Sequence, residues 1–258
     1  MKALTLPWGL KLSVKINESV GQAIWQLGVY DLVVSETLWR LTDPEDFAVD
    51  IGANIGYMTS ILAARMSKKG RIVAFEPHPE LFARLEENVR GWNCQNQIDL
   101  VNTALSETEG IRSLSMPDEF NGNEGIASLT RKILSGRSID VLSSTLDNVF
   151  SHPPYPTLIK IDIEGAEAEL VRGGRKLLHS HQVRDIIFED HERQPSQTTN
   201  TLTECGYRVF KLTRSFFGPK LMSPLTESGS KWEPPSYLAT MDAQRALDRM
   251  GAVGWKIL

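Results

Sequence analysis

Two apolar runs, each ending in an acidic residue or a glycine-containing turn, constrain the fold of this chain more than any other feature. The first run spans residues 47–51 and leads into a turn that contains Gly52 and Gly56. The second run spans residues 71–76, and its last residue, Glu76, lies 24 residues beyond Gly52. In parallel α/β sheets such a turn follows the first strand, and an acid at the end of the second strand binds ribose hydroxyls. The spacing therefore predicts an adenosine-containing ligand.

The turn after the first run differs from the turn of dinucleotide-binding proteins. Those proteins use G-x-G-x-x-G to bring the backbone against a pyrophosphate, whereas this chain has D-x-G-x-x-x-G from Asp50 to Gly56. Asp50 stands two residues before Gly52, and a carboxylate there favours a cationic ligand over a diphosphate. S-adenosylmethionine carries an ammonium and a sulfonium. The pattern therefore indicates S-adenosylmethionine as cofactor and methyl transfer as the reaction.

Asn54 stands where the broad methyltransferase pattern D/E-x-G-x-G-x-G has its middle glycine. Asparagine tolerates a left-handed backbone better than most side chains, so we expect the turn to survive this exchange. A simpler interpretation of Gly52 and Gly56, as turn and helix-packing glycines, stays open.

Length, composition and charge bound the class of protein. The chain has 258 residues, 41% of them hydrophobic, which suffices for one large core with at most a small appendage. The net charge is −4 and no long run of Lys or Arg occurs, so a nucleic-acid partner is disfavoured. No stretch reaches the roughly 18 apolar residues of a membrane span, and the two cysteines have no metal or redox spacing. We expect a cytoplasmic protein without a membrane partner; its oligomeric state cannot be read.

Predicted strands and helices alternate along the chain. We expect strands at 47–51, 71–76, 98–103, 157–162, 184–190, 207–212 and 236–240, and an extra short strand at 138–142. We expect helices at 55–67, 79–90, 166–178 with an interruption near Gly173 and Gly174, 197–204, and after residue 240. This alternation predicts an α/β fold, a mostly parallel Rossmann-like sheet with helices on both faces.

Two parts of the chain fall outside that alternation. Residues 1–45 read as an N-terminal leader or helical cap, and residues 46–258 as the methyltransferase domain. The polar stretch 104–137 is longer than a compact core usually tolerates, so we expect a lid, a binding loop or a partly disordered segment there.

Acidic residues end four of the predicted strands, and packing alone explains such a concentration poorly. Converging carboxylates are costly unless they meet a cation or a hydrogen-bond donor. The cofactor-binding candidates at these strand ends are Asp50, Gly52, Ala53, Asn54, Gly56, Tyr57, Glu76, Pro77, Thr103, Ala104 and Asp162. Among them, Glu76 is expected to accept hydrogen bonds from both ribose hydroxyls, and Thr103 and Ala104 are expected beside the adenine.

Five segments together carry a resemblance to a known family. They are Val49–Gly56, Ala74–Pro77, Asn102–Ser106, Lys160–Glu167 and Phe188–Glu189. With them the chain resembles, from about residue 28 to 240, the FkbM-type methyltransferases, a branch of the class I S-adenosylmethionine-dependent enzymes. The resemblance implies a seven-stranded sheet and methyl transfer, commonly to a hydroxyl of a small metabolite or sugar. It does not choose the acceptor, and a carrier-bound intermediate is a further option.

The catalytic candidates on the acceptor side are Asp162, Glu164, Glu189 and His191. Methyl transfer requires the acceptor oxygen, methyl group and sulfur in line, and a hydroxyl acceptor also requires a base. Histidine has the unperturbed pKa best suited to that task, although His191 could equally be a solvent-facing loop residue. The four side chains could instead orient the acceptor or hold a divalent cation, but no tight ligand spacing indicates a metal.

Three alternatives to a small-molecule O-methyltransferase are disfavoured by the sequence. A nucleotide-dependent oxidoreductase on a similar sheet is disfavoured because G-x-G-x-x-G is missing. A non-catalytic S-adenosylmethionine-binding module is disfavoured because the acids at four strand ends are intact. The segment Ser151–Tyr155 looks like the motif of amino-group methyltransferases, but it precedes the strand at 157–162 instead of following the fourth strand. We interpret it as a turn.

Overall fold

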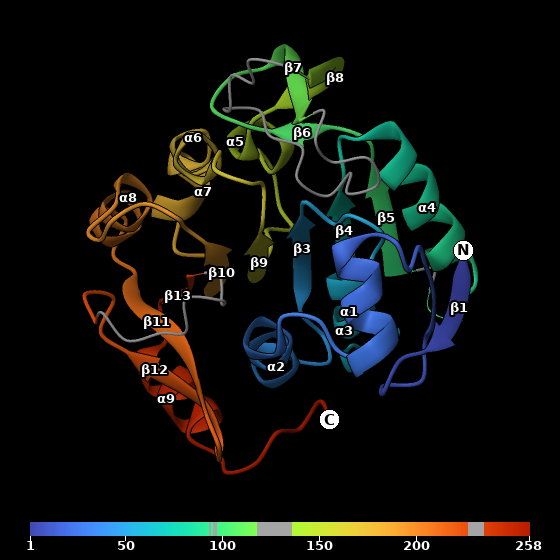
Figure 1. Cartoon of the computed structure of the whole chain (residues 1–258). Helices are drawn as coiled ribbons and strands as arrows, with labels where there is room; N and C mark the ends of the chain where they lie inside the picture. Colours follow the sequence, from blue (N-terminus) through green and yellow to red (C-terminus); the bar gives the residue numbers. More distant parts are fainter. Residues whose placement is uncertain (93, 95–96, 118–135, 227–234) are drawn as a thin grey trace.

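One eight-stranded sheet with helices on both faces forms the body of the protein (Figure 1). The structure, a computed structural model, describes residues 1–92, 94, 97–117, 136–226 and 235–258. The strand order is β12-β11-β13-β10-β9-β3-β4-β5. Its members are β3 (Phe47–Ile51), β4 (Arg71–Phe75), β5 (Ile98–Val101), β9 (Leu158–Ile161), β10 (Asp185–Glu189), β11 (Arg208–Ser215), β12 (Gly218–Met222) and β13 (Ser236–Thr240).

The parallel part of the sheet brings the expected strand ends to one edge. Strands β5, β4, β3, β9 and β10 are mutually parallel, whereas β13 is antiparallel to both β10 and β11. In the register of β3 with its two neighbours, Asp50 lies opposite Ala74 on β4 and Lys160 on β9. The carboxyl ends of β3, β4 and β9 are therefore neighbours, as the sequence predicted.

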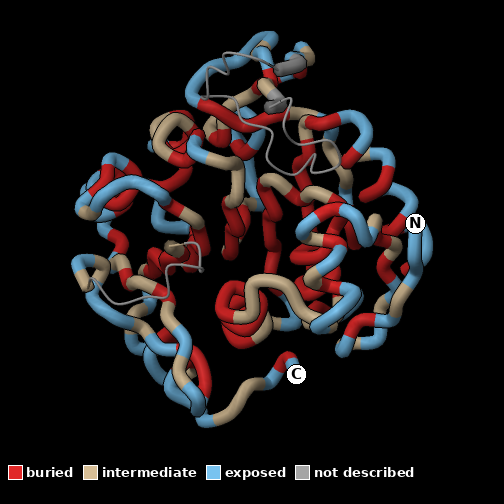
Figure 2. The backbone as a smooth tube through the Cα atoms, viewed as in Figure 1, coloured by how far each residue is buried: buried red, intermediate tan, exposed pale blue. Residues whose placement is uncertain are grey.

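Helices cover the sheet in two layers, and each layer has its own apolar core. The helices are α1 (Ser19–Leu27), α2 (Leu32–Leu41), α3 (Tyr57–Arg65), α4 (Pro79–Arg90), α5 (Leu146–Val149), α6 (Glu167–Arg172), α7 (Arg175–His179), α8 (Gln197–Glu204) and α9 (Ala243–Met250). Side chains from α1 to α4 and α9 share one core, and those from α5 to α8 share the other. On β3, Ala48 faces the first core and Val49 the second, because strand side chains alternate. Figure 2 shows these central strands as buried.

Strand β12 is an eighth strand of the sheet, added to the seven that the sequence predicted. It pairs with β11 at the edge of the sheet, with Ser215 opposite Gly218 and Arg214 opposite Pro219. Glycine and proline are poor strand formers, and proline is accepted only where no ladder hydrogen bond is needed, as at an edge. Their presence hid this strand from the pattern.

The N-terminal segment contains a hairpin that the sequence did not reveal. Strands β1 (Lys2–Thr5) and β2 (Lys11–Val14) pair with each other and precede α1. The hairpin is fastened to α4 and the residues after it, because Asn88 Oδ1 accepts from Ser13 N at 2.8 Å and Trp92 Nε1 donates to the Lys11 carbonyl at 2.7 Å. Four-residue strands with so few buried side chains offer too little periodicity to predict.

A small second sheet replaces part of the expected loop at 104–137. Its strands are β6 (Ala104–Leu105), β7 (Gly110–Pro117) and β8 (Gly136–Ser144), in the order β6-β8-β7. The extra strand expected at 138–142 is thus longer, and it belongs to this sheet. Residues 118–135, the middle of the expected loop, lie outside the described residues. In Figure 1 the small sheet lies beyond the carboxyl ends of β3 and β4.

Candidate active site

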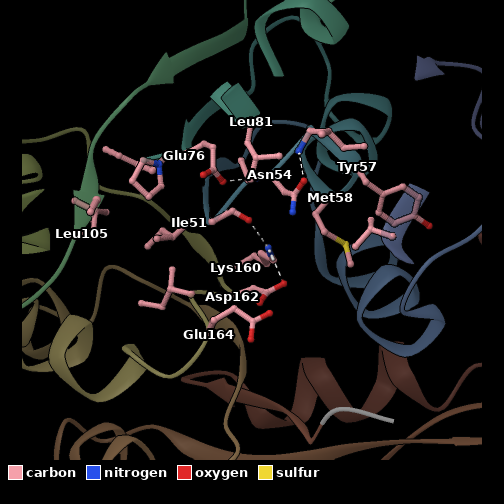
Figure 3. Close-up of a pocket in the computed structure, with 18 of the residues that line it drawn as sticks. Ile51, Asn54, Tyr57, Met58, Glu76, Leu81, Leu105, Lys160, Asp162 and Glu164 are labelled. Carbon is pink, nitrogen blue, oxygen red and sulfur yellow. Dashed lines mark hydrogen bonds and ion pairs between the residues drawn. The ribbon is translucent and has the colours of Figure 1, made fainter. Parts of the chain in front are cut away.

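A cavity of about 230 Å³ opens where the carboxyl ends of β3, β4 and β9 meet (Figure 3). The turn after β3 forms one wall, the end of β4 another, and the segment after β9 a third. Ser19 and Val20 of α1, together with Tyr30, line it from the N-terminal segment. The sequence-predicted residues that line it are Gly52, Ala53, Asn54, Tyr57, Glu76, Pro77, Thr103, Ala104, Asp162 and Glu164.

The turn after β3 requires backbone conformations with positive φ, which few residue types adopt. Gly52 and Gly56 have φ values of +74° and +93°, and Asn54 has +52°. A Cβ at Gly52 would lie 1.8 Å from the backbone oxygen of Asp162, so no side chain fits there. At Gly56 a Cβ would meet Leu85 Cδ1 at 2.8 Å. Gly56 does not line the cavity; it makes room for α4, as the simpler interpretation proposed, whereas Asn54 keeps the turn as expected.

Glu76 presents a buried carboxylate to the cavity. Its Oε2 accepts from Asn54 N at 2.8 Å and its Oε1 accepts from His78 N at 2.9 Å. The residue is 5% exposed, and burial, only partly opposed by these two donors, raises the pKa of Glu76 to about 7. Each carboxylate oxygen has a second acceptor position, so the group can still accept two hydroxyls.

This pKa predicts a pH-dependent affinity for a ligand that donates hydroxyls to Glu76. The ionised carboxylate is the better acceptor, and its fraction falls as the pH drops through 7. Affinity for S-adenosylhomocysteine should therefore decrease about tenfold from pH 8 to pH 6. Isothermal titration at a series of pH values checks this, and an affinity that does not change over that range would contradict the assignment.

Asp50 does not line the cavity, which corrects its expected contact with a ligand ammonium. It is fully buried beneath the turn, where its Oδ2 accepts from Thr59 Oγ1 at 2.6 Å. Its other oxygen lies 3.3 Å from Lys160 Nζ. The cation that Asp50 meets is therefore a lysine of the same chain.

Lys160 is the site residue that the sequence reasoning missed. It sits on β9 beside Asp50, and its ammonium also donates to the Gly52 carbonyl at 3.1 Å. Asp162 Oδ2 lies 3.5 Å from the same nitrogen. A signal was present in the sequence, because one lysine interrupts the apolar run Leu158–Ile161. A lysine in a strand that is buried on both faces needs an oppositely charged partner, and the strand that carries this partner must lie next to it.

The acceptor-side candidates gather next to this cavity. A smaller cavity, lined by Asp31, Glu189 and Ser236 among others, shares Asp162 with the larger one. Glu189 Oε1 lies 2.5 Å from Nε2 of His191, whose side chain is about half exposed. Burial and the nearby carboxylates, Asp162 first among them, raise the pKa of Glu189 to about 9. Within the described part of the chain, no three His, Cys, Asp or Glu side chains gather closely enough to hold a metal ion.

Backbone strain is concentrated at the same place. Among the described residues, the non-glycine residues with positive φ are Asp31, Asn54, Glu164 and His181. The first three line the two cavities. Such backbone costs about 1–3 kcal/mol per residue and persists at sites where function requires it. This clustering supports the cavities as the functional site.

A sequence profile of the methyltransferase FkbM domain matches residues 50–209, more than half of the chain and all of the strand ends around the cavity. The chain belongs to the FkbM methyltransferase family. The family that the five segments suggested is thereby confirmed, and the protein is a methyltransferase. The profile begins at Asp50, the buried anion beneath the turn.

Relatives of this FkbM methyltransferase carry methyltransferase names. Hexuronic acid methyltransferase AglP of Haloferax volcanii is 28% identical over 202 residues, an alignment that covers 75% of this chain and 78% of AglP. Methyltransferase sdnD of Sordaria araneosa is 27% identical over 213 residues, with 70% and 80% covered. The solved METTL16 MTase domain matches with a TM-score of 0.50 at 13% identity, covering 90% of this chain and 73% of that one, which is a likeness of fold.

Two further features of the FkbM chain lie outside the cavity. None of the helices in the described ranges has the length and apolar content of a membrane span. The segment Ser151–Tyr155 is exposed over residues 151–154 and precedes β9. Because it lies at the amino end of that strand, it stands away from the edge where the cavity opens, as the turn interpretation requires.

Proposed function

We propose that this methyltransferase transfers a methyl group from S-adenosylmethionine to a hydroxyl of a small metabolite, a sugar or a carrier-bound intermediate. The bound donor supplies an electrophilic methyl group on its sulfonium. The residues of the chain bind and orient donor and acceptor and take up the proton that the hydroxyl loses.

The cavity suits this donor at both of its ends. At one end Glu76 can accept the ribose hydroxyls, and apolar side chains such as Phe75 and Leu105 can contact an adenine. At the other end lie the carboxylates of Asp162 and Glu164, which favour a cation such as the donor's ammonium. A charged ligand with an apolar ring therefore finds complementary groups.

The position of Glu189 carries the proposal of O-methylation. Its carboxyl group lines the smaller cavity, which adjoins the larger one through Asp162. The smaller cavity has a volume of about 10 Å³, which admits a single hydroxyl group and not a whole acceptor. An acceptor hydroxyl that reaches it would have the donor on one side and Glu189 on the other. Glu189 can take its proton, and the half-exposed His191, 2.5 Å away, can pass that proton to solvent.

A rate that increases with pH is the expected signature of this base. The pKa of Glu189 is near 9, so the fraction of Glu189 that is ionised increases as the pH is raised toward 9. The ionised carboxylate is the form that can act as a base. With donor and acceptor saturating, kcat should increase about tenfold from pH 7 to pH 8. Glu189→Gln should give a low rate without this rise. The matched variant Glu86→Gln, on the exposed face of α4, should keep it, and a flat wild-type profile would contradict the role.

The acceptor class is tested by labelled methyl transfer to a panel of hydroxylated metabolites, sugars and hexuronic acids. The name of AglP makes sugar acids the first set to include. Mass spectrometry of the product then identifies the methylated atom. Transfer to oxygen supports the proposal, whereas transfer only to nitrogen refutes it. Binding of S-adenosylhomocysteine without any turnover would favour the non-catalytic binding module.

We further propose that residues 1–45 act as a cap over the donor. Ser19, Val20 and Tyr30 already line the cavity from that segment. A cytoplasmic location, and the absence of nucleic-acid and membrane partners, stay predictions.

A further inference from the structure

Lys160 joins three segments of the site through one ammonium group (Figure 3). Its side chain is 4% exposed, and its nitrogen lies within 3.5 Å of oxygens from Asp50, Gly52 and Asp162. These oxygens belong to β3, to the turn after β3 and to the segment after β9. Burial alone would lower the pKa of Lys160, but Asp50 and Asp162 outweigh that effect and raise the pKa. The lysine is therefore charged.

Neutralising Asp50 explains only part of this arrangement. A buried Asp50–Lys160 pair would satisfy both charges without any contact to the cavity. Lys160 nevertheless lines the cavity, and it holds two further oxygens that also belong to the cavity wall. One is the carbonyl of Gly52, and the other is the carboxylate of Asp162, which is 32% exposed and borders both cavities.

The two oxygens that Lys160 holds lie on the carboxylate-rich side of the cavity, opposite Glu76. In Figure 3, Glu76 lies beside Asn54, whereas Lys160 lies between the turn and Asp162, with Glu164 beyond. If Glu76 accepts the ribose hydroxyls, the side of the cavity near Asp162 receives the amino acid moiety of the donor, which carries the ammonium.

We propose that Lys160 is a positioning residue. Its ammonium holds the Gly52 carbonyl and the Asp162 carboxylate where they receive the amino acid moiety of the donor. This inference rests on the proposed function. It predicts that Lys160 contributes to binding of the amino acid moiety and not to binding of the adenosine moiety.

Two variants test this role without leaving a buried charge unpaired, because Lys160 keeps Asp162 as a partner when Asp50 is neutralised. Lys160→Met by itself would strand Asp50 in the interior, which is strongly destabilising. The double variant Asp50→Asn/Lys160→Met removes both charges, and the single variant Asp50→Asn is its reference. Thermal unfolding of both shows whether each is folded.

The readout is the affinity for two adenosine thioethers that differ only in the second group on sulfur, which is the amino acid moiety in one and a methyl group in the other. S-adenosylhomocysteine has the moiety, and 5′-methylthioadenosine lacks it. Compared with Asp50→Asn, the double variant should bind S-adenosylhomocysteine about tenfold more weakly, because the Gly52 carbonyl and the Asp162 carboxylate are no longer held toward the amino acid moiety. Its affinity for 5′-methylthioadenosine should stay within about twofold.

Each other result decides against the inference in a distinct way. Equal affinity of both variants for S-adenosylhomocysteine would mean that Lys160 only neutralises Asp50 and does not support donor binding. Equal weakening for both ligands would mean that Lys160 supports the turn as a whole. A double variant that does not fold beside a folded Asp50→Asn would also assign it to stability. Absence of S-adenosylhomocysteine binding by the wild type would overturn the proposed donor together with this inference.

Discussion

Alanine in place of Glu76 is expected to weaken the binding of S-adenosylhomocysteine about a hundredfold. The buried carboxylate accepts from Asn54 N and His78 N and keeps one acceptor position on each oxygen for the ribose. Hydrogen bonds to a charged group contribute about 1.5–3 kcal/mol each. Losing two of them costs about 3 kcal/mol, which corresponds to the hundredfold change.

Isothermal titration measures this loss, and thermal unfolding shows whether the fold survives. We expect it to survive, because Asn54, one of the two released backbone donors, lines the cavity and its N–H can bind water. Glu86→Ala removes an exposed glutamate from the neighbouring helix α4 and should leave the affinity unchanged. Glu76→Gln should fall between, because its amide oxygen can still accept from one hydroxyl. Wild-type affinity in Glu76→Ala would remove Glu76 from the cofactor site.

Gly52→Ala is expected to have the largest effect of any single substitution in the turn. Its φ of +74° costs a side chain about 1–2 kcal/mol, and the new Cβ would lie 1.8 Å from the Asp162 backbone oxygen. The strand ends of β3 and β9 must separate to relieve that contact. A total cost of about 3 kcal/mol should lower the melting temperature by roughly 10 °C, and S-adenosylhomocysteine binding should become undetectable.

Gly28→Ala is the matched control for backbone strain. Gly28 has a φ of +75°, almost that of Gly52, but a Cβ there would have only Pro7 at 4.0 Å. It should therefore show the strain without the contact, a fall of a few degrees in melting temperature with binding intact. If calorimetry finds the same fall for both variants, the close approach of the two strand ends is not what requires glycine at position 52.

The sequence predicted the parts of the fold in which local pattern and tertiary packing agree. The helix at 197–204 and the strand at 236–240 match to the residue, because one has a capping residue, Ser196, and the other is an uninterrupted buried run. The break near Gly173 separates α6 from α7 as expected. Strand β12 and the N-terminal hairpin were missed because their short strands carry edge residues and few buried side chains.

The candidate site was predictable as a location but not as a network of contacts. Strand ends are set by local sequence, so the residues around Gly52, Glu76 and Asp162 could be placed at one edge. Partners across strands depend on register, and register alone puts Lys160 beside Asp50. The motif around Asp50 therefore indicated a cationic ligand, although the ammonium beside Asp50 belongs to Lys160 of the same chain.

Titration of the wild-type protein with S-adenosylhomocysteine, and separately with NAD, decides whether the cavity binds the methyl donor. We expect one site with micromolar affinity for S-adenosylhomocysteine and no detectable binding of NAD, because the turn after β3 lacks the G-x-G-x-x-G of pyrophosphate binders. Binding of NAD in place of S-adenosylhomocysteine, or of neither ligand, would contradict the assignment of the cavity to the methyl donor.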